Sequence, residues 1–269
     1  MNFNDLFQYK DLDMFYCDID TERERGLLIN EDCMKVLKQL DDNSVDLTLT
    51  DIPYGEVNRV SNGLRNFDKG DADIVTFELE PFIEEIYRIT KGTIIVFCGQ
   101  EQFSFIINWF TNRQKINKDK IMVRQLVWKK SNPSPVNGQY SYLSGLENVV
   151  WCKKKGATFN AHCKSNVFEF PCGRSKLHPT EKNHALLEDL IKDNSNEGEI
   201  IFDPCCGSGS HCYIAKKLNR RYMGIELNND QIYASYKMEN WWHHSTEQLF
   251  QISGGPRQRQ DIFSTIFDR

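Results

Sequence analysis

The sequence predicts an α/β fold, in which helices cover both faces of a mostly parallel sheet. Short apolar runs that are typical of buried strands alternate along the chain with stretches of helical periodicity. Carboxylates at positions 32, 51, 203 and 226 come just after such runs, and a glycine-rich turn follows one of them. This alternation builds parallel sheets, whose ligands bind where the strands end.

The individual elements follow from the same patterns. Five apolar runs are expected to form parallel strands, at 25–30, 45–50, 93–98, 199–202 and 222–226. Helical periodicity occurs at 32–40, 77–90, 102–110, 183–194, 211–218 and 230–242. Segments 124–130 and 147–153 flank a linker rich in Ser, Pro, Asn, Gly and Tyr, and are expected to form one antiparallel pair. Residues 157–177 have no clear period.

The composition is that of an ordinary globular protein. The 269 residues are expected to form one domain, 1–269, with a short basic insertion at roughly 131–177. The longest strongly apolar run, 93–98, is far shorter than the roughly 20 residues of a membrane helix, and no signal peptide is expected. Nine cysteines without a CxxC pair favour free thiols in the cytoplasm. The spacing of Cys163, Cys172, His162 and His178 fits no zinc motif, so no metal is expected.

Positive charge is concentrated in residues 113–182, which carry 14 basic and 4 acidic side chains in a protein of net charge −5. A segregated positive surface suits the phosphate backbone of a nucleic acid. A solvated face on which charges happen to cluster is the alternative. The candidate phosphate-binding residues are Lys129, Lys130, Lys153, Lys154, Lys155, Lys164, Arg174 and Lys176.

A glycine-rich segment, 202–210 (FDPCCGSGS), follows one of the expected strands. Its glycines let backbone amides approach a ligand closely, and the helix that follows favours negative groups at its N-terminus. Glu226 ends the next strand, 17 residues after Gly209, where an acid binds ribose hydroxyls in nucleotide-binding sheets. Because the loop lacks the GxGxxG pattern, the two features together predict a nucleoside ligand rather than a dinucleotide.

The segment Asp51-Ile52-Pro53-Tyr54 follows another strand directly. Ile52 precedes a proline and is therefore kept extended, while Pro53 fixes its own φ. The resulting stiff turn presents a carboxylate, a carbonyl and an aromatic ring, which together could hold a planar amine. Taken alone, the same residues also fit a structural turn with a surface tyrosine.

Five segments, which occur along the chain in the family's order, resemble the β-type amino-methylating DNA methyltransferases, in which the catalytic motif precedes the cofactor motif. Residues 51–54 (DIPY) are similar to the family's Asp-Pro-Pro-Tyr, and 178–182 (HPTEK) to its His-Pro-Thr-x-Lys-Pro. Segment 203–210 (DPCCGSGS) is similar to Asp-Pro-Phe-x-Gly-Ser-Gly-Thr, 128–133 (WKKSNP) to Trp-x-Lys-x-Asn, and 30–51 to the lead-in to the catalytic strand. The resemblance covers roughly residues 25–240.

Five positions depart from the family pattern without removing a needed chemical group. Ile52 replaces a proline but keeps its carbonyl, and Ser210 replaces threonine but keeps a hydroxyl. Asn183 replaces the last proline of the His-Pro segment, and Cys205-Cys206 replace bulkier residues. The chain therefore resembles a divergent member.

The resemblance implies a Rossmann-like methyltransferase fold with S-adenosylmethionine as cofactor. It implies that Asp51 and the Ile52 carbonyl accept the two hydrogens of an exocyclic amine, and that Tyr54 stacks on a base flipped out of the duplex. Asp32 would contact the cofactor's adenine, Glu226 its ribose, and the glycine loop its methionine part. The full set implied to bind the cofactor is Asp32, Cys33, His178, Thr180, Lys182, Asp203, Pro204, Cys205, Gly207, Ser208, Gly209, Ser210, Glu226 and Leu227.

The function implied is site-specific methylation of double-stranded DNA. Asp rather than Ser in the catalytic motif favours adenine N6 over cytosine N4, without settling it. Two alternatives stay open: methylation of RNA or of a protein amide, and a DNA-binding module without activity. The motifs predict neither a recognition sequence nor a restriction partner, and leave open whether the chain forms a homodimer.

Overall fold

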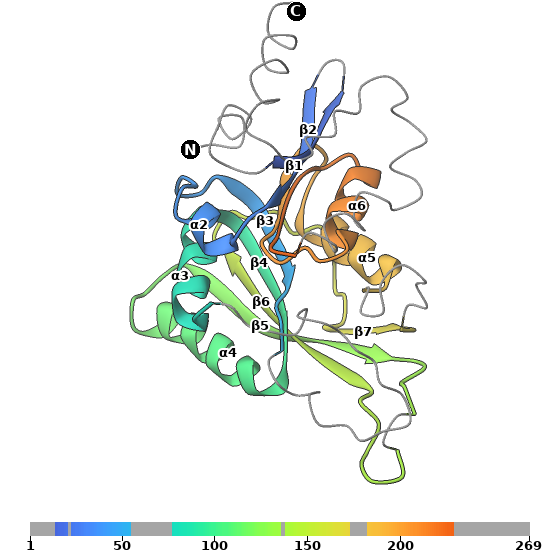
Figure 1. Cartoon of the computed structure of the whole chain (residues 1–269). Coiled ribbons are helices and arrows are strands. Elements are labelled where there is room, and N and C mark those ends of the chain that lie inside the picture. The colour runs from blue at the N-terminus through green and yellow to red at the C-terminus, as the bar shows by residue number, and fades with distance from the viewer. Residues whose placement is uncertain (1–13, 21–22, 55–76, 136–137, 173–181, 229–269) are drawn as a thin grey trace, which may run out of the picture.

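One nine-stranded sheet with helices on both faces organises the described residues, 14–20, 23–54, 77–135, 138–172 and 182–228, of the computed structural model (Figure 1). The strands are β1 (Met14–Asp20), β2 (Arg23–Asn30), β3 (Val45–Asp51), β4 (Thr90–Cys98), β5 (Ile121–Lys130), β6 (Leu146–Lys154), β7 (Val167–Phe170), β8 (Ile200–Asp203) and β9 (Arg221–Glu226). The helices are α2 (Cys33–Leu37), α3 (Leu79–Ile89), α4 (Gln100–Lys115), α5 (His184–Asn194) and α6 (Ser210–Lys217). None of these described helices is long and apolar enough to cross a membrane.

The sheet is mostly parallel, as the sequence predicts. Its strand order is β1-β2-β9-β8-β3-β4-β6-β5-β7, and the five strands from β2 to β4 in that order are mutually parallel. The predicted antiparallel pair is β5 with β6. The described strands contain two further antiparallel pairs, β1 with β2 and β4 with β6.

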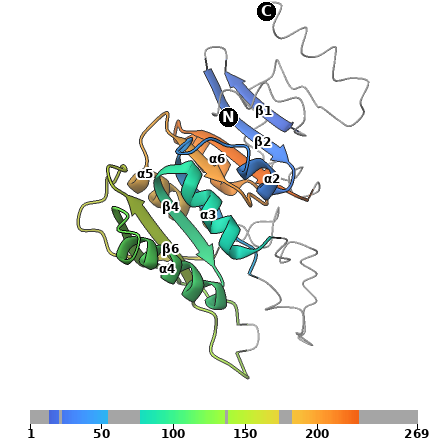
Figure 2. The same ribbon diagram turned by 90° about the vertical axis from the view of Figure 1, so that its left-hand side faces the viewer.

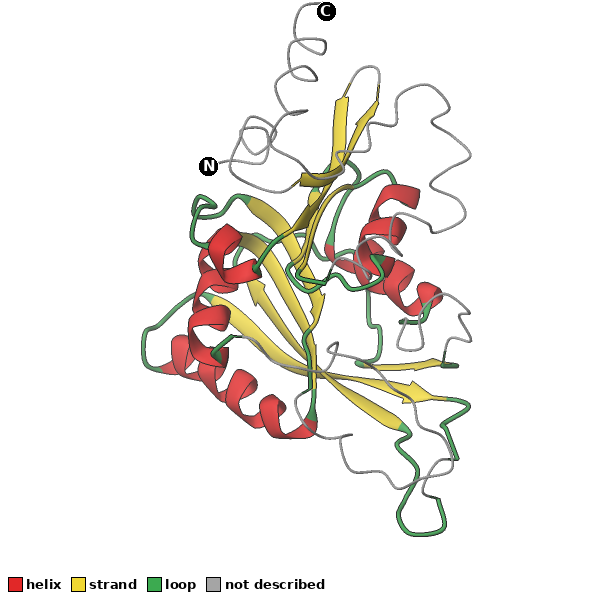
Figure 3. Ribbon diagram, in the orientation of Figure 1, coloured by secondary structure: helices red, strands yellow, loops and turns green. Residues whose placement is uncertain are grey.

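Alternating side chains on the central strands feed two hydrophobic cores, one on each face. Ile94 and Val96 of β4 pack in a cluster with residues of α2, α3 and α4, whereas Ile95 and Phe97 pack in a second cluster with residues of α5 and α6. Helices α3 and α4 lie on the face turned toward the viewer in Figure 2, and Figure 3 shows helices on both sides of the sheet. Since both faces are covered, most positions of the central strands β3 and β4 are buried, and both strands contain apolar runs that the sequence shows clearly.

The sequence pattern misses the two strands at the ends of the sheet order. β1 reads MFYCDID and β7 only VFEF, so neither contains a long apolar run. An edge strand pairs with one neighbour and needs less apolar surface, so its pattern is weaker. The helix expected at 230–242 lies outside the described residues.

The carboxyl ends of β2, β9, β8 and β3 meet at one edge of the sheet, and all the predicted acids lie there. Asp51 ends β3 and Asp203 ends β8, its neighbour in the sheet. From β3 the chain proceeds to β4 on one side, and from β8 to β9 on the other. This is the topological switch point at which open α/β sheets bind their ligands.

Candidate active site

Asp51 is placed at the sheet edge by the pairing of β3 with β4. Asp51 lies beside Phe97 in the register, and the Ile52 amide donates to the Phe97 carbonyl at 3.2 Å. The Ile52 side chain is buried, with an exposed fraction of 1%. A buried anchor directly after the acid fixes where the carboxylate projects, so the turn is part of the sheet rather than a loose surface loop.

Gln102 braces the rest of this turn from the first turn of α4. Its Oε1 accepts from the Gly99 amide at 2.9 Å, and its Nε2 donates to the Pro53 carbonyl at 2.7 Å. Gly99 leaves room for the approach, since a Cβ there would lie 3.3 Å from the Tyr54 Cβ. One amide therefore joins the DIPY segment to the N-terminus of a helix.

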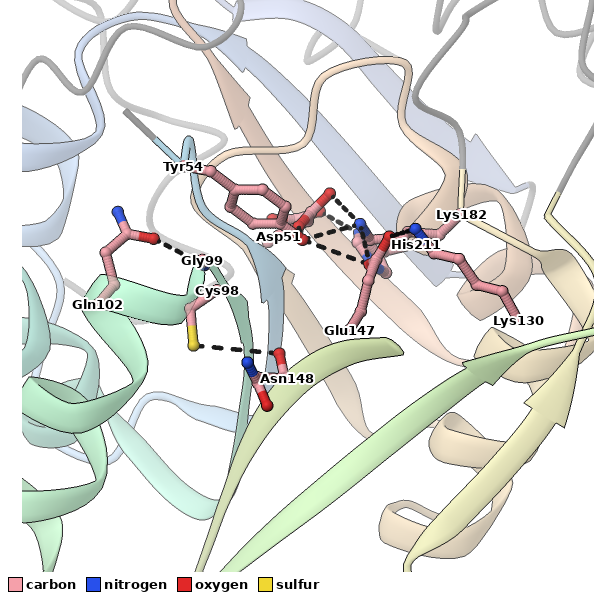
Figure 4. A network of polar contacts seen from close by, with 11 residues as sticks. Asp51, Tyr54, Cys98, Gly99, Gln102, Lys130, Glu147, Asn148, Lys182 and His211 are labelled. Carbon is pink, nitrogen blue, oxygen red and sulfur yellow. Dashed lines mark hydrogen bonds and ion pairs between the residues drawn. The ribbon is translucent and has the colours of Figure 1, made fainter. Parts of the chain in front are cut away.

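A buried lysine joins the side chains around Asp51 (Figure 4). Lys182 Nζ lies 2.7 Å from Asp51 Oδ2, 2.9 Å from Glu147 Oε2 and 3.1 Å from the Tyr54 hydroxyl oxygen. The Tyr54 hydroxyl donates to Asp51 Oδ1 at 2.7 Å. We call Asp51, Ile52, Pro53 and Tyr54 together with Glu147 and Lys182 the catalytic corner.

The protonation of these groups follows from burial and from their neighbours. Burial raises the pKa of Asp51 above its ordinary value, Lys182 and the Tyr54 hydrogen bond oppose that rise, and Glu147 adds to it. Burial alone would lower the pKa of Lys182, but Asp51, Tyr54 and Glu147 raise it well above its ordinary value, so the group is an ammonium. Burial favours the neutral form of Glu147, yet Lys182 and Lys130 lower its pKa to about 2.

Lys130 also belongs to this network. Its Nζ lies 2.9 Å from Glu147 Oε1, and both side chains are only 15% exposed. Contact of Lys130 with DNA phosphates stays a prediction, and it would compete with this ion pair.

The second group at this edge is built around the glycine loop, 204–209. Asp203 is 1% exposed; its Oδ1 accepts from the Cys205 amide at 3.1 Å, and its Oδ2 pairs with His211 Nδ1. Gly207 and Gly209 have φ values of 50° and 76°, which favour glycine at both turns of the loop. In this arrangement Asp203 holds the loop in shape.

Glu226 lies on the other side of the same loop. Its Oε2 accepts from the Gly207 amide at 2.9 Å and its Oε1 from the Asn228 amide at 2.8 Å. Burial raises the pKa of Glu226, and the backbone donors act against that rise. We call Asp203, the glycine loop and Glu226 the cofactor corner.

Asp32 joins the cofactor corner through the sheet. Asn30 pairs with Glu226 in the register of β2 and β9, so Asp32 follows a strand end next to that carboxylate. Asp32 also caps α2, because its Oδ1 accepts from the Met34 amide at 2.8 Å. Cys33 begins that helix and is buried, whereas Leu227 is exposed.

The structure brings residues 51–54 (DIPY) and the glycine loop to the same edge of the sheet. Lys182 contacts the DIPY segment and not the glycine loop among the contacts described. Its described partners are Asp51, Tyr54 and Glu147, so its predicted place beside the cofactor stays a prediction. Four predicted residues lie outside the described part of the chain: His178, Thr180, Arg174 and Lys176.

The lysine run 153–155 lies at the opposite edge of the sheet from Asp51. Lys153 pairs with Thr93 near the start of β4, while Asn148 pairs with Cys98 at its end. Five residues of strand separate the two positions, about 17 Å along β6. Lys154 also donates to the Tyr87 carbonyl at 2.6 Å and is half-buried. The structure therefore does not bring this run to the catalytic corner.

The two remaining candidates in the basic block have acidic partners. Lys129 is exposed and lies 3.0 Å from Glu169, and Lys164 lies 3.1 Å from Asp189 and 2.8 Å from Asp193. Their contact with phosphates stays a prediction, and it would compete with these ion pairs.

Sequence reasoning missed three residues of the site: Glu147, Gln102 and His211. Glu147 stands at the start of a strand, four residues before Trp151, and nothing in its immediate surroundings distinguishes it from a surface acid. One signal was available, since Glu147 is one of only 4 acids within the basic segment 113–182. Gln102 and His211 carry no such signal, because each acts through contacts that only the fold brings about.

Comparison with known proteins gives matches over most of the chain. A family model described as DNA methylase, of the N6/N4 type, matches residues 45–237. The type II methyltransferase M.HpaI of Haemophilus parainfluenzae is 32% identical over 238 residues, which cover 76% of this chain and 71% of that protein. M.HinfI of Haemophilus influenzae is 27% identical over 249 residues, covering 78% and 67% of the two chains.

Solved structures show the same fold. The M1.HpyAVI–SAM complex has a TM-score of 0.59 and 24% identity, covering 79% of this chain and 98% of that one. The PvuII DNA methyltransferase, described as cytosine-N4-specific, has a TM-score of 0.62 and 15% identity, covering 79% and 85%. With an acid-led turn and a glycine loop side by side at the switch point and a family model spanning both, the chain belongs to the N6/N4 DNA methylase family.

Proposed function

We propose that the protein methylates the N6 amine of adenine in duplex DNA, with S-adenosylmethionine as methyl donor. The observation that carries the proposal is the position of Asp51 at the carboxyl end of β3, directly beside β8 and the glycine loop that follows it. An amine held at Asp51 and a nucleoside held at the glycine loop would be neighbours across the switch point.

The cofactor corner suits a nucleoside ligand. The carboxylate of Glu226, held by two backbone amides, is an acceptor for a pair of ribose hydroxyls, and Asp203 with the two positive-φ glycines shapes the loop beside it. The buried Nε2 of His211 has no hydrogen-bond partner among the described residues. The cofactor supplies a methyl group activated by a sulfonium.

The catalytic corner suits the amine of a flipped base. The lone pair of such an amine is delocalised into the ring, so acceptors on both hydrogens are needed to make the nitrogen more nucleophilic. Asp51 supplies one acceptor and the Ile52 carbonyl the other, while the Tyr54 ring is the surface on which the base stacks. Asp51 Oδ2 already accepts an N–H from Lys182 in this structure, which supports the view that the position binds nitrogen donors.

Recognition of the DNA sequence is proposed for the insertion at roughly 131–177. The linker 131–145 contains no Asp, Glu, Lys or Arg, and its Tyr140, Tyr142 and Leu143 are exposed. A surface of hydroxyls, amides and aromatic rings is suited to base edges rather than to phosphates. We also propose that the protein acts on DNA inside the cell, in the cytoplasm.

Cytosine N4 is the second candidate, favoured by the fold likeness to PvuII DNA methyltransferase, which is described as cytosine-N4-specific. The two candidates separate in one experiment. Unmethylated genomic DNA is incubated with the protein and labelled S-adenosylmethionine, digested to nucleosides and analysed by mass spectrometry. N6-methyldeoxyadenosine is the expected product; N4-methyldeoxycytidine would establish the second candidate, and label in neither would refute the proposal.

A further inference from the structure

Lys182 has a complete set of partners that binding a cofactor would not require. Its side chain is 7% exposed, and its three N–H groups face three oxygens, on Asp51, Glu147 and Tyr54. It also lies 5.2 Å from the centre of the Phe97 ring. An ammonium that is buried this far must be paired, and both of its ionic partners are carboxylates of the catalytic corner.

The charges around Asp51 alternate in sign. Asp51, Lys182, Glu147 and Lys130 follow one another as negative, positive, negative and positive, with contacts of 2.7, 2.9 and 2.9 Å. They come from β3, from the residue two before α5, from β6 and from β5. Because these four residues come from four different segments of the chain, only the folded structure shows that they form one network.

Two further titratable groups face Asp51. The Tyr54 hydroxyl donates to it at 2.7 Å, and burial raises the pKa of that hydroxyl well above its ordinary value, so the proton stays on the oxygen. The Cys98 thiol of β4 is neutral as well, since burial and Asp51 raise its pKa to about 12. Lys182 is therefore the one positive charge in direct contact with Asp51 among the described residues.

An Asp51 that binds an amine must be ionised. A protonated carboxyl has turned one oxygen into a donor, so it competes with the amine hydrogens instead of accepting them. Burial and the negative charge of Glu147 both favour that protonated form, whereas the Lys182 cation and, less strongly, the Tyr54 hydrogen bond oppose it.

We propose that Lys182 is a positioning residue for methyl transfer: its ammonium, held between Asp51 and Glu147, keeps the Asp51 carboxylate ionised and turned toward the target amine. The inference rests on the proposed function of Asp51, and it names the cation that keeps a buried Asp51 carboxylate ionised. Glu147 and Lys130 act one step further away, because Glu147 holds the ammonium in place and Lys130 neutralises Glu147.

The test is the pH dependence of the chemical step. Single-turnover methylation of unmethylated genomic DNA with labelled S-adenosylmethionine is followed from pH 4.5 to 9. Lys182→Met removes the cation, so its rate relative to the unmodified protein should be about tenfold lower at pH 6 than at pH 9. Lys182→Arg keeps the charge and should keep the acid limb of the profile where it is, even where its maximal rate is lower.

Glu147→Gln tests the same idea with the opposite sign. Removing the second carboxylate relieves the repulsion on Asp51, so the acid limb should move to lower pH. Lys192→Met is the matched control for the lysine variants, because Lys192 lies on α5, is 53% exposed and pairs only with Glu188 among the described ion pairs. Its profile should coincide with that of the unmodified protein.

The outcomes separate the inference from the function beneath it. An Asp51→Ala variant that still methylates DNA would refute the role of Asp51 itself. An inactive Asp51→Ala together with a Lys182→Met whose rate is lowered equally at every pH would overturn the inference alone and make Lys182 a structural anchor. Thermal denaturation checks folding, and should Lys182→Met not fold, an unmoved acid limb in Glu147→Gln overturns the inference just as well.

Discussion

The catalytic corner and the cofactor corner sit on adjacent strands, yet their carboxylates are held in different ways. Asp51 and Glu147 are each in contact with lysine side chains, at 2.7 to 2.9 Å. Glu226 is held by two backbone amides, and Asp203 by one amide and His211. Lysine charges hold the carboxylates of the catalytic corner, whereas backbone amides hold most of the carboxylate oxygens of the cofactor corner.

The difference matches what each corner is asked to do. A carboxylate that binds two hydroxyls needs only to be an acceptor in a fixed place, and amides of a rigid loop provide that. A carboxylate that accepts hydrogens from an amine during methyl transfer must also keep a definite charge as the base enters and water leaves. The catalytic corner should therefore respond to pH and to charge substitutions, and the cofactor corner to changes of shape.

The largest effect is expected for Asp51→Ala. It removes an acceptor of the amine hydrogens and should lower turnover by at least about 10²-fold, as loss of one preorganised polar group does. DNA affinity should hardly change, because phosphate contacts dominate it. Labelled-methyl incorporation and a DNA-binding titration measure the two quantities side by side.

Two variants sharpen that result. Asp51→Asn keeps a side-chain oxygen and should retain more activity than Asp51→Ala. Asp46→Asn is the matched control: Asp46 lies near the other end of β3, where it pairs with Lys91 at 2.6 Å and accepts from the Ile200 amide at 2.9 Å, so loss of its charge should lower thermal stability and spare turnover. Comparable losses of turnover in both asparagine variants would mean that Asp51 acts only through folding.

In the cofactor corner, Glu226→Ala should weaken binding of S-adenosylmethionine by about 1–3 kcal/mol, the cost of unmade buried hydrogen bonds. Calorimetry with the cofactor measures it directly. Because burial raises the pKa of Glu226, affinity should begin to fall at a higher pH than for an ordinary glutamate as the solution is acidified. Unchanged affinity in Glu226→Ala would remove this residue from the site.

The sequence predicts the two corners unequally, for a physical reason. In the cofactor corner, Asp203 and the glycine loop lie within one short segment whose pattern is local (strand, acid, glycines, helix), and Glu226 ends the strand that follows. Asp51 is equally visible because it follows an apolar strand. Their common edge could be predicted as well, since parallel strands end together.

The partners of Asp51 could not be predicted, because they are separated from it in sequence. Glu147 is 93 residues from Tyr54, and Lys182 is 128 residues from it. The pairing of β3, β4 and β6 brings Glu147 to Asp51, and Lys182 joins them from the segment just before α5. The charge count of residues 113–182 was also ambiguous, because it does not show that Lys130 faces a carboxylate or that Lys153 lies at the far edge. The edge strands β1 and β7 were missed since their polar residues break the apolar pattern.

A smaller effect is expected for Gln102→Ala, which loosens the catalytic corner without touching its charges. The DIPY turn loses its bond from α4 to Pro53, and turnover should fall by about tenfold, because small displacements of reacting groups are costly. Gln114→Ala is the matched control on the same helix, since Gln114 Nε2 donates to the Ile121 carbonyl at 2.8 Å, in another part of the fold. A similar fall in turnover for both would mean that α4 stability, not the turn, is what matters.

The smallest effect is expected at the sheet edge opposite both corners. Lys153 of β6 pairs with the start of β4, and Lys155 follows it. The double variant Lys153→Ala/Lys155→Ala should therefore leave the slope of log K for DNA binding against log salt concentration nearly unchanged.

The comparison variant is Arg174→Ala/Lys176→Ala, whose residues precede Lys182 by eight and six positions. It should make that slope shallower by about 1.8, because each lost phosphate contact removes about 0.9. Lys154 is left in place, since it packs 4.1 Å from the centre of the Tyr87 ring and its loss would confuse stability with binding. DNA-binding titrations at several salt concentrations measure both slopes. A shallower slope for Lys153→Ala/Lys155→Ala would mean that the duplex binds at the far edge of the sheet, away from the catalytic corner.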